Sequence, residues 1–225
     1  MYNTLAILES VKKDIEGGNY HVSPARFAVI TDEIIRIREE IAKKAAKASG
    51  KTNLLKACKS ILKAANKGYN RALHGVTTIN GTSYVCDNSR LIAFPAGAVD
   101  LPGIPENVKP LDFESIMKHD VFSIELSLPD AGYIKEELKR IKAAEKAAGR
   151  KPYRYIIRIS DMFFNAEYLK DAIEATGASL GHSCGEKCPL HVIGGENASV
   201  TAIVLPIHPG SVSKDLKDWE VAAIY

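Results

Sequence analysis

The chain has 225 residues, of which 46% are hydrophobic and 25% charged, as is ordinary for a soluble globular protein of one large or two small domains. No apolar run approaches the roughly eighteen residues that span a bilayer, and the N-terminus lacks the apolar core of a signal peptide, so we expect a cytoplasmic protein with reduced thiols and no membrane partner. The net charge of +3 is too small to indicate a nucleic-acid partner unless the charges cluster.

The first fifty residues are predicted to be helical. A helix over residues 4–16 ends at two consecutive glycines. A second helix begins at Thr31 or Asp32, either of which can cap it, and ends before Gly50. Its isoleucines recur at helical spacing, with acidic residues early and lysines late, which suits the helix dipole. Residues 1–50 are therefore expected to form an N-terminal helical extension.

A basic helix is predicted next, from a cap at Thr52 or Asn53 to a stop at Gly68. Its apolar residues share one side, and its lysines recur at steps of three and four residues on another. The basic residues, including one arginine beyond the helix, are Lys56, Lys59, Lys63, Lys67 and Arg71. This stripe has two interpretations: a solvated helix face, or a set of phosphate contacts to duplex DNA without sequence preference.

Three short strands are predicted after this helix, over residues 71–79, 82–88 and 90–95. Asn80-Gly81 joins the first two strands, and this dipeptide is the strongest short hairpin signal. The following segment, residues 95–112, is rich in proline and is predicted to be a loop or an edge segment.

Strands and helices continue along the rest of the chain, which predicts an α+β fold. A strand at 121–128 precedes a long charged helix at 133–149. A strand at 153–160 and a helix capped by Asn165 follow. The last predicted strands cover residues 178–184, 188–193 and 199–207, and residues 210–225 form a C-terminal tail.

Asp87 lies near the end of the second of the three short strands, and Arg90 begins the third. We interpret them as a turn ion pair or an Asx-turn, because a catalytic role would need another acid or a histidine that the sequence does not indicate. Glycine-rich phosphate loops and the HExxH zinc motif are absent from the sequence. We therefore expect no enzymatic activity, no catalytic residue and no cofactor.

The segment GHSCGEKCPLH gathers two cysteines and two histidines within residues 181–191. If a hairpin turns between the cysteines, Cys184 and Cys188 lie opposite each other, His182 shares their face, and His191 points to the other face. A tetrahedral zinc site needs four ligands, and this arrangement supplies three at most, so we predict no metal. We interpret the cysteines as a thiol pair that can form a cross-strand disulfide in air, with a zinc or enzymatic module as an alternative.

Three segments, in order, resemble a domain of the bacterial DNA polymerase sliding clamp. The first, residues 52–94, has a helix with periodic lysines and the stretch CDNSRLIAF where the family has a TDGHRLA-type stretch. The second, MFFNAEYLKDAIEATG at 162–177, is similar to the family's F-N-x-x-Y-L-x-D-x-L step from strand to helix. The third, CPLHVIGGENASVTAIVLPI at 188–207, is similar to its closing hairpin. The resemblance implies a DNA-clamp-like α+β domain with an antiparallel sheet over residues 51–209.

The resemblance also implies partners. In clamps the helices bring lysines to the DNA backbone, and the end of the chain helps form a hydrophobic pocket for peptides of polymerases and repair factors. By this likeness the basic stripe would bind double-stranded DNA, and Leu205, Pro206 and Ile207 would bind peptides of replication proteins. This chain has room for one such domain where a clamp subunit has three, and the helix at 133–149 is not part of the usual unit. Unpaired edge strands favour self-association, while ring formation does not follow.

Two hypotheses about function remain. The first is a non-enzymatic clamp-like binding module that contacts duplex DNA or docks replication and repair proteins. The alternative is a structural or interaction protein that has the clamp fold and does not bind DNA. The tail leaves a similar choice, since Trp219 and Ile224 either cover apolar surface or occupy a partner pocket.

Overall fold

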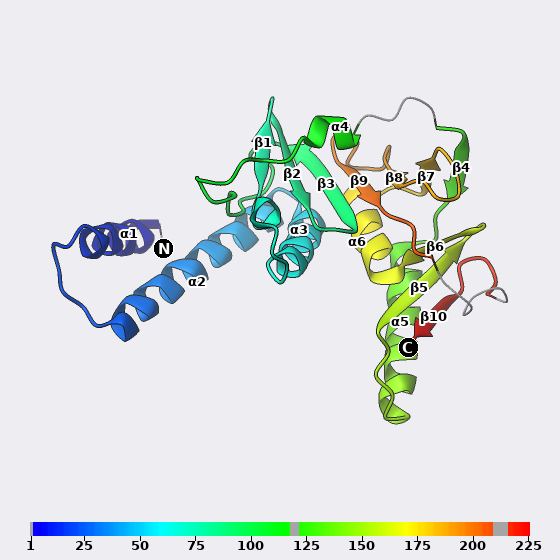
Figure 1. Cartoon of the computed structure of the whole chain (residues 1–225), viewed down its shortest axis with the longest axis horizontal. Coiled ribbons are helices and arrows are strands. Elements are labelled where there is room, and N and C mark those ends of the chain that lie inside the picture. Colours follow the sequence, from blue (N-terminus) through cyan, green and yellow to red (C-terminus); the bar gives the residue numbers. More distant parts are fainter. Residues whose placement is uncertain (1, 118–121, 209–215) are drawn as a thin grey trace. The chain divides into compact units, whose positions relative to one another are not determined.

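The computed structural model describes residues 2–117, 122–208 and 216–225 (Figure 1). The chain divides into two compact units, Met1–Thr52 and Asn53–Tyr225. The second unit combines helices with antiparallel sheets, which confirms the expected α+β class. Within the described ranges, no helix is long and apolar enough to cross a membrane.

The first unit is a pair of helices, α1 (Tyr2–Glu16) and α2 (Pro24–Ala48). Helix α2 starts earlier than the predicted cap at Thr31, because Ser23 caps it and Pro24 is its first residue, a favourable pair at a helix start. The Thr31 hydroxyl instead donates to the Phe27 carbonyl oxygen inside the helix, at 3.0 Å. The start at Thr31 or Asp32 was therefore wrong.

The larger sheet of the second unit has seven strands in the order β1-β2-β3-β9-β8-β7-β4, all antiparallel to their neighbours. Its strands are β1 (Thr77–Ile79), β2 (Thr82–Cys86), β3 (Arg90–Pro95), β4 (Ile124–Ser127), β7 (Leu180–Ser183), β8 (Leu190–Val192) and β9 (Thr201–Val204). Asn80 and Gly81 form the predicted two-residue turn, with φ values of 49° and 80° that suit a type I′ hairpin. Residue 121, the predicted start of β4, lies outside the described residues.

A smaller sheet contains β10 (Val221–Ile224), β5 (Arg154–Ile159) and β6 (Met162–Asn165), in that order. Residues 210–225 were expected to form a tail, but their described end is a strand that pairs antiparallel with β5 (Figure 1). Val221 is buried in the main core, so burial of apolar surface favours this strand. The predicted boundary between domain and tail, residues 209–210, lies outside the described residues.

Three longer helices accompany the sheets: α3 (Thr52–Ala65), α5 (Ala131–Ala147) and α6 (Ala166–Thr176). Asn165 caps α6 as predicted, and its side chain accepts hydrogen bonds from two backbone N–H groups. Helix α3 ends three residues before the predicted stop at Gly68, so Lys67 lies in a turn. A 3₁₀ turn, η1 (Arg71–Leu73), replaces the first part of the strand that was predicted over 71–79.

The main hydrophobic core lies on one face of the seven-stranded sheet and extends to the smaller sheet. Alternation along β2 and β3 sends Val85 and Ile92 into this core, together with the apolar sides of α3, α5 and α6. The opposite face holds a smaller cluster with Tyr84. The short helix α4 (Phe113–Met117), which the sequence analysis did not predict, covers this cluster by stacking Phe113 on Tyr84 with ring centroids 5.0 Å apart.

Candidate nucleic-acid interface

The exposed side of α3 and the turn after it carries four of the five cations in the predicted stripe. Lys56 and Lys63 are exposed on the helix, Lys67 is exposed in the turn, and Arg71 is exposed on η1. Lys56 and Lys63 are seven residues apart, so they lie almost in line and about 10.5 Å apart along the helix axis.

Lys59 does not share this exposed side. It is half-buried and its Nζ atom is buried, because a step of three residues from Lys56 turns it by about 60° toward the packed side of the helix. Helical spacing predicted four lysines on one side of the helix, with Arg71 as an addition beyond it, and the structure exposes four of these five cations to solvent.

The four exposed cations also lack acidic neighbours. Among the residues that the structure describes, none of the four takes part in an ion pair. Exposed cations elsewhere do pair, as Arg36 does with Glu33 and Arg140 with Glu137. The sequence from residue 41 to 86 contains nine Lys and Arg residues and no Asp or Glu, so the rest of this chain of net charge +3 carries a net charge of −6. The excess of positive over negative charge is thus concentrated in one continuous fifth of the chain.

Hydrogen bonds fix the turn that follows α3. The backbone N–H of Gly68 donates to the Ala65 carbonyl oxygen at 2.8 Å, and a ring nitrogen of His74 lies 3.0 Å from the Gly68 carbonyl oxygen. The Asn70 side chain accepts from the N–H of Ala72 at 3.1 Å and so caps η1. Tyr69 stands on this turn with its side chain fully exposed. Tyr69 was not among the predicted site residues, although its position between Lys67 and Arg71 gives the alternation of basic and aromatic residues that is typical of nucleic-acid surfaces.

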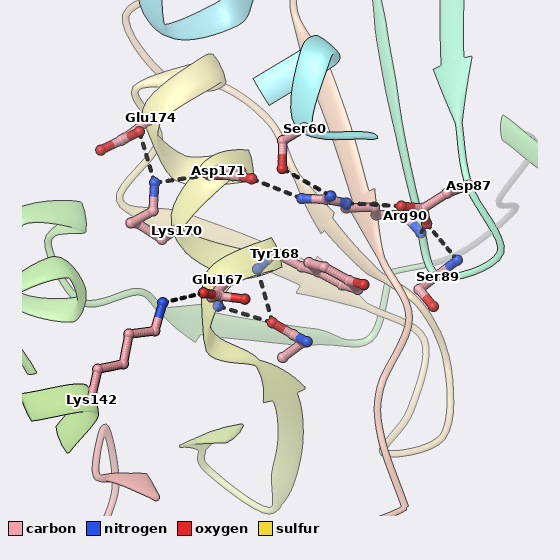
Figure 2. A network of polar contacts seen from close by, with 11 residues as sticks. Ser60, Asp87, Ser89, Arg90, Lys142, Glu167, Tyr168, Lys170, Asp171 and Glu174 are labelled. Atoms are coloured by element: carbon pink, nitrogen blue, oxygen red, sulfur yellow. Dashed lines mark hydrogen bonds and ion pairs between the residues drawn. The ribbon is translucent and has the colours of Figure 1, made fainter. Parts of the chain in front are cut away.

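Arg90 is the centre of a buried polar network behind α3 (Figure 2). Its guanidinium donates to Asp87 at 3.1 Å and to Asp171 of α6 at 2.8 Å. It also donates to the Ser60 hydroxyl of α3 at 3.1 Å and lies over the ring of Tyr168, 3.9 Å from its centroid. Arg90 therefore ties β3 to α3 and α6 at one point.

Asp87 closes the turn before β3, as predicted. One of its carboxylate oxygens accepts from the backbone N–H groups of Ser89, at 2.8 Å, and Arg90, at 3.0 Å. The predicted Asx-turn and ion pair are both confirmed.

The charges on α6 are used within the protein (Figure 2). Lys170 donates to Asp171 at 2.8 Å and to Glu174 at 3.0 Å, and Lys142 of α5 pairs with Glu167. Burial lowers the pKa of Lys170, but the hydrogen bonds and negative charges of Asp171 and Glu174 together raise it by more, so the net shift is upward.

Two cavities open beside this network, and Tyr168 lines both. One, of about 210 Å³, lies between the end of α3, the turn that carries Tyr69 and the turn at Asn88 and Ser89. The other, of about 560 Å³, lies between α5 and α6 with Ser60 of α3 at its edge.

The hairpin with the two cysteines has a different register from the predicted one. His182 pairs with His191 across β7 and β8, and the ring of Phe122 lies 5.6 and 5.0 Å from the two imidazole rings. The prediction that the histidines point to opposite faces was therefore wrong. Pro189 explains the shift, because it has no N–H to donate to a strand ladder and β8 starts after it.

Cys184 and Cys188 lie in the loop beyond these strands. They are joined as a disulfide with Cα atoms 5.7 Å apart, so the sulfur atoms pair as predicted but not across the strands.

The other two cysteines are free thiols. Burial raises the pKa of the Cys58 thiol to about 12. Burial, and to a smaller extent the negative charge of Asp87, raises the pKa of the Cys86 thiol to about 12. Within the described residues, no three or more His, Cys, Asp or Glu side chains gather as a metal site.

The predicted peptide-binding residues follow β9. The N–H of Leu205 donates to the Ser89 carbonyl oxygen at 2.9 Å, and that of Ile207 donates to the Phe163 carbonyl oxygen at 2.7 Å. The segment therefore crosses from the larger sheet to β6. Leu205 is 42% exposed, whereas Pro206 and Ile207 are half-buried, and none of the three lines either cavity described above.

Comparisons with known proteins give structural likeness only. No family model matches the chain, and no curated protein matches it. A Helicobacter pylori beta clamp bound to a DNA ligase peptide is 11% identical, with a TM-score of 0.46 over 69% of this chain and 63% of that one. A Caulobacter crescentus DNA polymerase sliding clamp is 13% identical, with a TM-score of 0.47 over 70% of this chain and 64% of that one.

A Thermotoga maritima DNA polymerase III beta subunit is 13% identical, with a TM-score of 0.46 over 69% and 63% of the two chains. These structures belong to the family that the sequence resembles. The match spans less than two thirds of each of these clamp chains.

Proposed function

We propose that this protein is a non-enzymatic binding module that contacts the phosphate backbone of duplex DNA through α3 and the turn after it. The observation that carries this proposal is the set of four exposed cations, Lys56, Lys63, Lys67 and Arg71, that have no ion-pair partner among the described residues. A solvated surface helix ordinarily mixes both signs of charge, as α2 and α5 do. Helix α3 contains no acidic residue, so nothing on it repels or competes with phosphate.

Charge reversal provides the test. Labelled 20-base-pair duplex DNA would be titrated with the full chain and with a triple variant, Lys56→Glu, Lys63→Glu and Lys67→Glu, at fixed low salt. Because each lysine would neutralise about one phosphate, the triple variant should bind more than about tenfold more weakly. Fluorescence anisotropy measures the change.

A matched control separates the local surface from the total charge. Lys135→Glu, Lys139→Glu and Lys146→Glu change three exposed lysines of α5 and alter the net charge by the same amount. This control should keep affinity within about threefold of the unchanged chain, because the remaining effect is long-range and screened. Equal losses in both triple variants would contradict a binding site on α3.

Peptide docking is a second candidate, supported by the 42% exposure of Leu205 at the end of β9. Peptides of replication or repair proteins would place an apolar side chain against Leu205, so Leu205→Glu should abolish their binding and leave DNA binding unchanged.

Strands β1 and β4 end the larger sheet, which supports self-association. Light scattering of the purified chain tests that assembly, and a monomer at all concentrations would contradict it.

A further inference from the structure

We propose that Tyr69 and the cavity beside it hold one unpaired base, so that the preferred ligand is a duplex with a single-stranded extension. This inference rests on the proposed DNA contact and names the kind of DNA end that the site selects. Three independent features of the turn after α3 support it: a displayed aromatic ring, flanking cations and a small cavity lined by both polar and apolar residues.

The first feature is the display of the aromatic ring. Single exposed aromatic residues are common on protein surfaces and need no explanation. Tyr69 differs because hydrogen bonds on both sides hold its turn, through Gly68 before it and Asn70 after it. A ring on a fixed backbone loses little conformational entropy when a base stacks on it, which favours stacking.

The second feature is charge. Tyr69 lies two residues from Lys67 and two residues from Arg71, and both cations are exposed. A base that stacks on Tyr69 would therefore have its own and neighbouring phosphates close to positive charge. Paired bases inside a duplex present no free ring face, so an unpaired base can stack on this ring where an interior base pair cannot.

The third feature is the cavity of about 210 Å³ that Tyr69 borders. It is smaller than the roughly 300–1,000 Å³ of ordinary small-molecule sites, which suits one planar ring system. Asn88 and Ser89 line it, and the structure shows no hydrogen bond from either side chain among the described residues. An amide and a hydroxyl in these positions can pair with the edge of an extruded base.

Asp87 borders the same cavity but is fully engaged, since it accepts from Arg90 and from two backbone N–H groups. The carboxylate is therefore neutralised and does not repel a nucleotide. Tyr168 forms the far wall, with its ring stacked on the buried Arg90 guanidinium. The cavity thus offers an aromatic face and hydrogen-bonding groups without an uncompensated negative charge.

The experiment compares two ligands on the full chain: a blunt 20-base-pair duplex, and the same duplex with five unpaired nucleotides at one end. The unchanged chain should bind the extended duplex on the order of tenfold more tightly, as expected for one stacked base. Tyr69→Ala should lower the ratio of the two affinities, extended over blunt duplex, from about ten to about one. Tyr69→Phe keeps the ring and should keep the preference.

Tyr153→Ala is the matched control, because Tyr153 is also a largely exposed tyrosine and lies outside α3 and its turn. It should leave the preference intact. Equal binding of the two duplexes by the unchanged chain, or equal losses on both duplexes in Tyr69→Ala, overturns this inference and leaves the DNA contact standing. Failure of the unchanged chain to bind either duplex at low salt overturns the proposed function, and this inference with it.

Discussion

Helices α3 and α6 both bury an apolar side in the same core, but they use their charged residues differently. On α3, Lys56 and Lys63 face solvent without an ion-pair partner among the described residues. On α6, Lys170 and Asp171 are partly buried and join the network centred on Arg90. Charges of α6 hold the helices and strands together, while the exposed Lys56 and Lys63 of α3 can meet a ligand. Substitutions should therefore affect stability at one helix and binding at the other.

The largest effect on stability is expected from Arg90→Ala. Removal of the guanidinium leaves the carboxylates of Asp87 and Asp171 without their buried cation, and such a loss costs about 3–5 kcal/mol. Urea denaturation measures the change in the free energy of unfolding. A loss below about 1 kcal/mol would show that the network is solvated and would remove the contrast between the helices.

Lys59→Glu tests whether Lys59 lies on the packed side of α3 and not on its exposed side. The Nζ atom of Lys59 is buried, so a carboxylate in its place would be transferred partly out of water, at a cost of about 2 kcal/mol. Lys63→Glu, at an exposed position, serves as the control and should change stability far less. Equal stabilities of the two variants would place Lys59 on the exposed stripe after all.

Lys170→Met tests the outer end of the α6 network. The variant keeps the aliphatic stem but loses hydrogen bonds to two carboxylates, Asp171 and Glu174. Because these groups are only partly buried, we expect a loss of about 1 kcal/mol in the free energy of unfolding. Thermal or urea unfolding detects it, and an increase in stability would contradict a structural role for this ion pair.

The smallest effect on stability should come from Lys56→Ala and Lys63→Ala. Substitutions at exposed positions without partners usually change the free energy of unfolding by less than about 0.5 kcal/mol. The same variants should nonetheless weaken binding to duplex DNA. A loss above about 1 kcal/mol in the free energy of unfolding of either variant would show that these lysines stabilise the fold.

Local signals in the sequence predicted much of this structure. The Asn80-Gly81 turn, the Asn165 cap and the Asp87 turn depend on residues within a few positions of one another, and all three are confirmed. Two other local features were misread: Ser23-Pro24 starts α2, and Pro189 delays β8.

Long-range pairing could not be predicted in the same way. Arg90 meets Asp171 across 81 positions of sequence, and the end of the chain pairs with β5, so both depend on how distant segments pack. Spacing placed Lys59 on the basic stripe because helical periodicity does not indicate how wide the buried side is. The sequence thus predicted the four exposed cations of the candidate site. It did not predict Tyr69, and it wrongly included Lys59.

The salt dependence of duplex binding tests the central claim most directly. If the four exposed cations each neutralise one phosphate, the logarithm of the binding constant should fall against the logarithm of salt concentration with a slope of about −3.6. For the triple variant Lys56→Glu, Lys63→Glu and Lys67→Glu, this slope should be less negative by about 3. A steep slope that is the same in both proteins, or no binding by the unchanged chain at low salt, would contradict the assignment of α3 as the DNA-contacting surface.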